Sequence, residues 1–224
     1  TKVVGPTNDT QILVDAMNKE TASGGGDGPE ALDAALHEAN RLLDGKTGTK
    51  VCVIITDAPP HGIGVIGDGF PQGTQGAGGW DPIHEANQLQ EKGARVYCIV
   101  EPCALFNGRT AAFYQGLADK TSGRLVPLAP PDNNEGHSGL MQALYGAAEE
   151  ARDEDIRSVV VGRMVTERQQ ELPEETMHDA QQAVYRSLAA ENTQTFELSA
   201  TSVKAQHSQL FAKATTLKQA MSLA

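Results

Sequence analysis

Two short segments of this sequence carry acidic side chains in positions suited to hold a cation. The glycine-rich stretch of residues 24–30 supplies Asp27 and Glu30, and Asp57 directly follows an apolar run. Carboxylate oxygens are preferred ligands of hard cations such as Mg²⁺. We therefore predict a divalent-cation site, for Mg²⁺ or else Mn²⁺ or Ca²⁺, that is built from Glu30, Asp57 and Asp27.

The expected strands determine where these acidic residues would lie. Residues 51–56 form a nearly continuous apolar run, which is typical of a strand that is covered on both faces. Ligands of open parallel sheets bind beyond the carboxyl ends of the strands, and Asp57 would leave its strand at that edge. An acidic residue there is also common as a turn former or helix cap, so the prediction depends on Asp57 together with Glu30.

Helical and apolar segments alternate from about residue 30 to residue 150. We expect helices near residues 9–19, 32–43, 83–89, 113–118 and 140–148, and strands at residues 51–56, 94–100 and 124–128. This alternation is typical of sheets built by right-handed β–α–β crossovers, so we predict an α/β fold with a doubly wound, mostly parallel sheet. The glycine- and proline-rich stretch of residues 59–81 is predicted to be a functional or mobile loop.

The expected strands stop near residue 150, and the composition then turns to Glu, Gln, Arg and Ala. We predict a helical appendage over residues 151–224, with a break between helices at Pro173. Apolar positions near its end alternate steps of four and three: Val203, His207, Leu210, Ala214, Leu217 and Met221. This seam suits pairing with another helix, but an amphipathic helix that packs on its own chain is the simpler interpretation.

The acidic segments also resemble a known family. Gly-Gly-Asp-Gly-Pro-Glu at residues 25–30, followed by Thr-Asp-Ala at residues 56–58, resembles the von Willebrand factor A domain, and most of all its integrin β-type variant. The longer strings Gly-Gly-Gly-Asp-Gly-Pro-Glu and Asp-Ala-Pro-Pro-His-Gly are similar to the A domains of alpha-kinase-linked proteins. The resemblance covers residues 1–150 and implies a Rossmann-like sheet with a metal-ion-dependent adhesion site.

The resemblance implies a role for each candidate ligand. Glu30 and Asp57 would each approach one Mg²⁺ directly or through water, and Asp27 matches an aspartate that helps to hold a neighbouring cation. The family's Asp-x-Ser-x-Ser segment, which supplies the core of the metal shell, does not occur in the 224 residues. We therefore expect residues 1–150 to be a partial, N-terminally truncated domain, with two strands and a helix upstream of residue 1.

The charge balance limits the classes of partner. Asp and Glu outnumber Lys and Arg by 29 to 18, and the net charge of −11 would repel nucleic-acid phosphates and anionic membranes. No apolar run approaches the roughly 18 residues that a membrane span needs. Three widely spaced cysteines indicate neither a disulfide framework nor a zinc site, so reduced thiols and a cytoplasmic location are expected.

These features predict a binding module without catalytic activity. The open coordination position of its cation would take an acidic side chain from a protein partner, and the loop at residues 59–81 would set specificity. The appendage would connect the module to another domain or partner. One alternative is a regulatory region of a larger enzyme, such as an alpha-kinase-linked protein.

A metal hydrolase is the second alternative. Asp57 and His61 would then act together, with His61 as base or zinc ligand and with His84 and His137 as possible additions. No catalytic signature such as Gly-x-Ser-x-Gly or His-Glu-x-x-His accompanies them. Glu101, which follows an expected strand much as Asp57 does, is either a further cation ligand or an ordinary turn residue.

Overall fold

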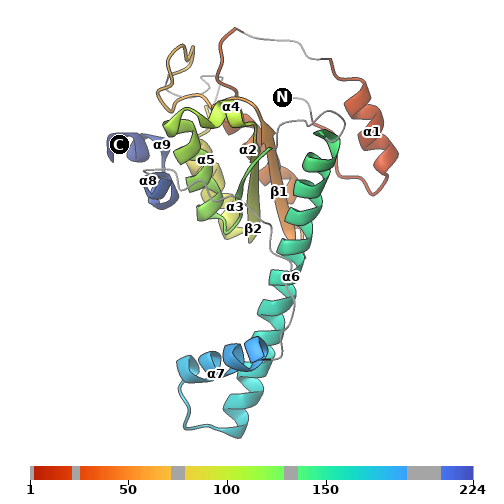
Figure 1. Cartoon of the computed structure of the whole chain (residues 1–224), viewed down its shortest axis with the longest axis vertical. Helices are drawn as coiled ribbons and strands as arrows, with labels where there is room; N and C mark the ends of the chain where they lie inside the picture. The colour runs from red at the N-terminus through yellow and green to blue at the C-terminus, as the bar shows by residue number, and fades with distance from the viewer. Residues whose placement is uncertain (1–2, 22–25, 72–78, 129–135, 191–207, 224) are drawn as a thin grey trace.

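The structure, a computed structural model, describes residues 3–21, 26–71, 79–128, 136–190 and 208–223. Three parallel strands form one open sheet in the order β1-β2-β3, and helices cover both of its faces (Figure 1). The strands are β1 (Lys50–Thr56), β2 (Ala94–Val100) and β3 (Leu125–Pro127). The helices are α1 (Thr10–Asn18), α2 (Leu32–Leu43), α3 (Pro82–Glu91), α4 (Pro102–Leu105), α5 (Gly108–Lys120), α6 (Gly136–Glu171), α7 (Met177–Ala190), α8 (Ser208–Lys213) and α9 (Leu217–Leu223). The α/β class and the parallel sheet are therefore confirmed.

The strand β2 is the centre of the sheet. It pairs with β1 from Lys50 opposite Ala94 to Thr56 opposite Val100, and its last three residues pair with β3. Six of its seven residues are buried, and the segment is apolar apart from Arg95, as expected for a strand that is covered on both faces. The three predicted strands fall on β1, β2 and β3, and β1 lies at one edge of the sheet.

Alternate residues of β2 enter two different apolar layers. Val96, Cys98 and Val100 belong to the main core, which α2, α3 and α5 complete on one face of the sheet. On the other face, Tyr97 packs against Ala147 and Ala151 of α6. Because strand side chains alternate between faces, the apolar residues on both faces of β2 require a layer of helices on each side. Arg95, the one charged residue of the strand, bonds to Asp155 of α6 at 2.7 Å.

Polar contacts fasten α2 to α3. The Asn40 side-chain amide donates to the backbone carbonyl and to Oε2 of Glu85, both at 2.8 Å. His37 Nδ1 lies 3.2 Å from Glu85 Oε1. A buried carboxylate is tolerated only when hydrogen bonds replace its hydration, and these contacts supply them. The position of α2 over the sheet is therefore fixed largely through α3.

The helix α6 continues past the sheet. It runs for 36 residues without a proline, and the predicted domain boundary near residue 150 falls inside it (Figure 1). Beyond the sheet, α7 folds back on α6. The two helices bury a small apolar cluster made by Val161, Val165, Ala180 and Val184. Pro173 lies between the two helices, as predicted. Neither α6 nor any other helix in the described ranges is long and apolar enough to cross a membrane.

The two C-terminal helices pack on the sheet-containing body. Phe211 of α8 is 1% exposed and meets Phe113 of α5 edge-on, with ring centroids 5.5 Å apart. Gly116 permits this approach, because a Cβ atom there would lie only 2.6 Å from the carbonyl oxygen of Ser208. Leu217 donates its N–H to Asp81 Oδ2 at 2.7 Å, which ties α9 to the start of α3.

These contacts decide between the two interpretations of the C-terminal seam. Ala214 and Leu217 are buried in the main core, and Met221 packs against it. The seam therefore packs on its own chain, and a break at residues 214–216 divides it into two helices. Val203 and His207 lie outside the described residues.

The Phe211 contact leads to a stability prediction. Phe211→Ala should lower the free energy of unfolding by about 3–5 kcal/mol, because it removes a fully buried ring and leaves a cavity against α5. Urea unfolding followed by circular dichroism measures this change. Phe106→Ala is the matched control, because Phe106 is 88% exposed and its loss should cost no more than about 0.5 kcal/mol. Equal effects would mean that α8 does not belong to the core.

Candidate cation-binding site

A two-residue contact brings the acidic segments together. Glu30 and Pro60 form an isolated parallel bridge: the N–H of Glu30 donates to the Pro59 carbonyl at 2.8 Å, and the N–H of His61 donates to the Glu30 carbonyl at 3.1 Å. The loop that enters α2 is thereby paired with the loop that leaves β1. Residues far apart in the sequence thus meet at the carboxyl edge of the sheet.

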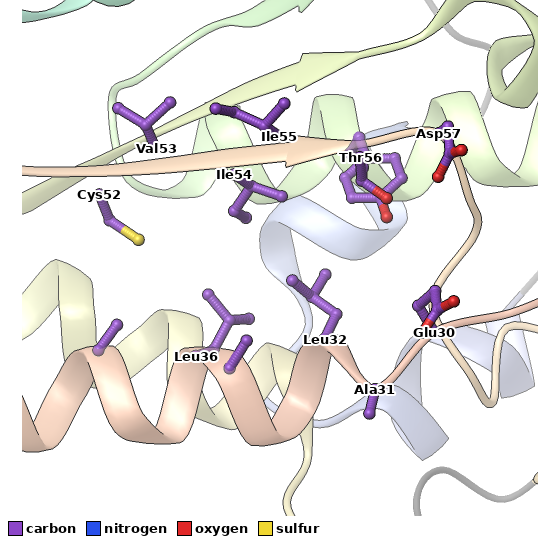
Figure 2. A pocket seen from close by; sticks show the side chains of 13 residues that line it. Glu30, Ala31, Leu32, Leu36, Cys52, Val53, Ile54, Ile55, Thr56 and Asp57 are labelled. Carbon is purple, nitrogen blue, oxygen red and sulfur yellow. The ribbon is translucent and has the colours of Figure 1, made fainter. Parts of the chain in front are cut away.

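Glu30 and Asp57 lie at the same end of a cavity between α2 and β1 (Figure 2). Among the described residues, no side chain or backbone group makes a hydrogen bond or ion pair with either carboxylate. Other acidic residues nearby are engaged: Asp81 caps α3 and Glu101 caps α4 through Cys103 N–H. The two predicted metal ligands therefore hold their oxygens free.

The cavity has a volume of about 610 Å³ and lies between α2 and β1. Its lining includes every residue from Cys52 to Asp57, together with apolar residues of α2 such as Leu32 and Leu36. Side chains of alternate strand residues point to opposite faces, as Val53 and Cys52 do in Figure 2.

Tyr114 supports the turn that carries Asp57. Its hydroxyl donates to the Ala58 carbonyl at 2.8 Å, and the side chain of Thr56 accepts the N–H of Ala58 at 3.1 Å. Burial raises the pKa of Tyr114, and the negative charges of groups around it, including Glu30 and Asp57, raise it further. The phenol therefore stays protonated and remains a donor near the two carboxylates.

Asp27, the third predicted ligand, lies in a different cluster. Its candidate ligand atoms and those of His61 and Asp68 are all within 4.8 Å of one another, so the three residues form a group that can hold a metal ion. His61 Nδ1 is 2.8 Å from Asp68 Oδ1 and 3.7 Å from Asp27 Oδ2. Asp68 had no place in the sequence-based prediction, because a Gly-Asp-Gly string in a loop reads as an ordinary turn.

Backbone groups hold the carboxylates of this cluster. Asp68 accepts the N–H groups of Gly62 at 2.7 Å and Phe70 at 2.8 Å, and Asp27 accepts that of Gly69 at 2.6 Å. Burial acts to raise the pKa of Asp68, but the hydrogen bonds from Gly62, His61 and Phe70 outweigh it and lower the pKa below its usual value. Asp68 is therefore an anion at neutral pH.

Other residues with a predicted role lie elsewhere. His84 is exposed on α3 and contacts Gln88, while the side chain of His137 lies outside the described residues. Glu101 is a helix cap rather than a neighbour of the two free carboxylates. Trp80, near the end of the predicted loop, stacks on His37, with ring centroids 4.4 Å apart. Residues 72–78 of the predicted loop also lie outside the described residues.

No family model, curated protein or solved structure matches the chain. What the chain binds is therefore inferred from its own side chains and their geometry.

The Tyr114 contact leads to a second stability prediction. Tyr114→Phe should lower the free energy of unfolding by about 1 kcal/mol, because it removes a buried hydrogen bond while the ring remains. Thermal or urea unfolding measures the difference. Tyr145→Phe is the matched control on an exposed side chain and should change stability by less than about 0.5 kcal/mol. If both variants behave alike, Tyr114 does not anchor the turn at Ala58.

Proposed function

We propose that the chain is a protein-binding module whose binding depends on a divalent cation held by Glu30 and Asp57. The observation that carries this proposal is the presence of two unpaired carboxylates at the carboxyl end of β1, beside a cavity. This is the place where open parallel sheets bind their ligands. Glu30 and Asp57 are both exposed, so a cation from solvent can reach their oxygens.

The donors at this end of the cavity fit a hard cation. Mg²⁺ prefers oxygen ligands and commonly binds through one or two carboxylates while keeping several waters. Glu30 and Asp57 supply the carboxylates, and the Thr56 hydroxyl lines the same cavity. Because the chain supplies only a few ligands, coordination positions remain open for an outside group. A carboxylate from a protein partner is the natural occupant. The cation would supply the attraction for that acidic group.

The resemblance to von Willebrand factor A domains supports the same proposal. The Gly-Gly-Asp-Gly-Pro-Glu string precedes α2, and Thr-Asp-Ala spans the end of β1. The parallel sheet with helices on both faces is compatible with a doubly wound fold of that family. The family's Asp-x-Ser-x-Ser segment is absent from the sequence. We therefore expect a weaker cation site than a complete adhesion site would form.

The hydrolase alternative has less support from the geometry. His61 directs Nδ1 to Asp68 and Asp27, and no hydrogen bond or ion pair joins it to Asp57 among the described residues. The side chain of His61 is also buried, with only 7% of its surface exposed. As a catalytic base, His61 would have to come within hydrogen-bond distance of a substrate bound at Asp57. Its buried position beside Asp68 does not favour that contact.

Cation titration tests the proposed site. Mg²⁺ and Mn²⁺ are added to the purified, tag-free chain, with heat and the electron paramagnetic resonance signal of Mn²⁺ as readouts. We expect saturable binding that Asp57→Asn and Glu30→Gln each weaken by at least about tenfold, since each removes a charged ligand. Asp44→Asn is the control, because this carboxylate is 81% exposed and lies at the far end of α2.

A second measurement tests the dependence of protein binding on the cation. The immobilised chain is exposed to candidate partners with Mg²⁺ and washed with EDTA, and the Asp57→Asn chain is treated in the same way. A partner that elutes with EDTA and does not bind the variant supports the proposal. Unchanged cation affinity in both Asp57→Asn and Glu30→Gln would contradict it.

A further inference from the structure

We infer that Asp27, His61 and Asp68 form a second cation site, which binds a divalent transition metal such as Zn²⁺ in preference to Mg²⁺. The site lies in the loop before α2 and in the loop after β1, which the Glu30–Pro60 bridge holds together. Its ligands differ from Glu30 and Asp57, so it stands whether or not the proposed function is correct.

The spacing of the cluster suits a single metal ion. Zinc binds imidazole nitrogen and carboxylate oxygen at about 2.0–2.2 Å, which places neighbouring ligand atoms roughly 3.3 Å apart in a tetrahedral site. His61 Nδ1 lies 2.8 Å from Asp68 Oδ1 and 3.7 Å from Asp27 Oδ2, and these separations bracket that value. Small side-chain movements would therefore bring all three residues onto one ion.

The charge of the cluster also favours a cation. The side chain of Asp68 is 2% exposed and that of Asp27 is 19% exposed, and among the described residues neither pairs with lysine or arginine. One imidazole faces two carboxylates, so a negative charge remains even when His61 is protonated. Charge that is withdrawn from water needs a compensating partner, and a divalent cation supplies it.

The types of ligand select among cations. Mg²⁺ and Ca²⁺ take oxygen donors almost alone, whereas Zn²⁺ and its neighbours bind imidazole as well as carboxylate. The second ring nitrogen of His61 has no hydrogen-bond partner among the described residues. The ion would bind Nδ1, the ring nitrogen that faces both carboxylates, and this mixed donor set favours Zn²⁺, with Co²⁺ and Mn²⁺ following in lower affinity.

Outer hydrogen bonds hold the carboxylates in place for this role. The N–H groups of Gly62 and Phe70 fix Asp68, and that of Gly69 fixes Asp27. Such outer contacts orient metal ligands and strengthen their binding. A Cβ at Gly69 would lie 2.9 Å from Asp27 Oδ2, so a larger residue there would displace this carboxylate. The ring of Phe70 packs edge-on against His61, with centroids 4.9 Å apart, and shields it from water.

Titration of the tag-free full chain with Zn²⁺ and with Co²⁺ tests the inference. We expect one site, visible as heat for Zn²⁺ and as visible absorption bands for Co²⁺, that an excess of Mg²⁺ does not displace. The ¹⁵N signals of the His61 ring should shift on Zn²⁺ addition. Asp27→Asn and His61→Gln should each lower Zn²⁺ affinity by at least about tenfold.

The controls separate this site from incidental binding and from the proposed function. His84→Gln changes an exposed histidine on α3 and should leave Zn²⁺ affinity unchanged, as should Asp57→Asn. Asp27→Asn keeps the size of the side chain and an acceptor for Gly69, so circular dichroism should show an intact fold. Unchanged Zn²⁺ affinity in Asp27→Asn and His61→Gln would overturn the second site. If Asp57→Asn still loses Mg²⁺ binding in that case, the proposed function stands although the second site does not exist.

Discussion

The arrangement at the carboxyl edge depends on the short bridge between Glu30 and Pro60. Two backbone hydrogen bonds join the loop before α2 to the loop after β1, and one of them uses a carbonyl of Pro59, which itself has no N–H to offer. Without this pairing, neither loop has regular structure that would define its place. The bridge puts Glu30 beside the strand end that carries Asp57, and it brings Asp27 near His61. Both groups of acidic residues therefore depend on the same two bonds.

The placement of α2 explains why a cavity persists beside β1. Glu85 of α3 is buried, and its hydrogen bonds to Asn40 and its contact with His37 hold α2 by one side. Apolar packing alone would draw α2 onto the strand, because cores close around voids. The polar contacts hold α2 against α3 instead, and about 610 Å³ lies between α2 and β1. The helix that forms one wall of the cavity is thus positioned by a buried polar network away from Glu30 and Asp57.

The sequence pattern predicted the strands well because β1 and β2 are largely apolar on both faces, which is typical of strands covered by helices on each side. It also placed Asp57 correctly, since a residue that leaves a parallel strand must lie at the carboxyl edge. The partners of Asp27 were not predictable in this way. Asp68 and His61 meet it through loop bonds to Gly62, Gly69 and Phe70, and such bonds leave no periodic pattern. The division of the C-terminal seam into α8 and α9 was likewise missed, because its steps of four and three read as one helix.

The helix α6 is shared by two separate apolar cores. Ala147 and Ala151 pack under the sheet, while Val161 and Val165 pack against α7. Each residue of an α-helix turns the chain by about 100° and advances it by about 1.5 Å. The direction in which the α6–α7 hairpin faces is thus set by the number of residues between the two cores. Insertion of a single residue there would swing the hairpin by more than a quarter turn about the helix axis while leaving both cores intact.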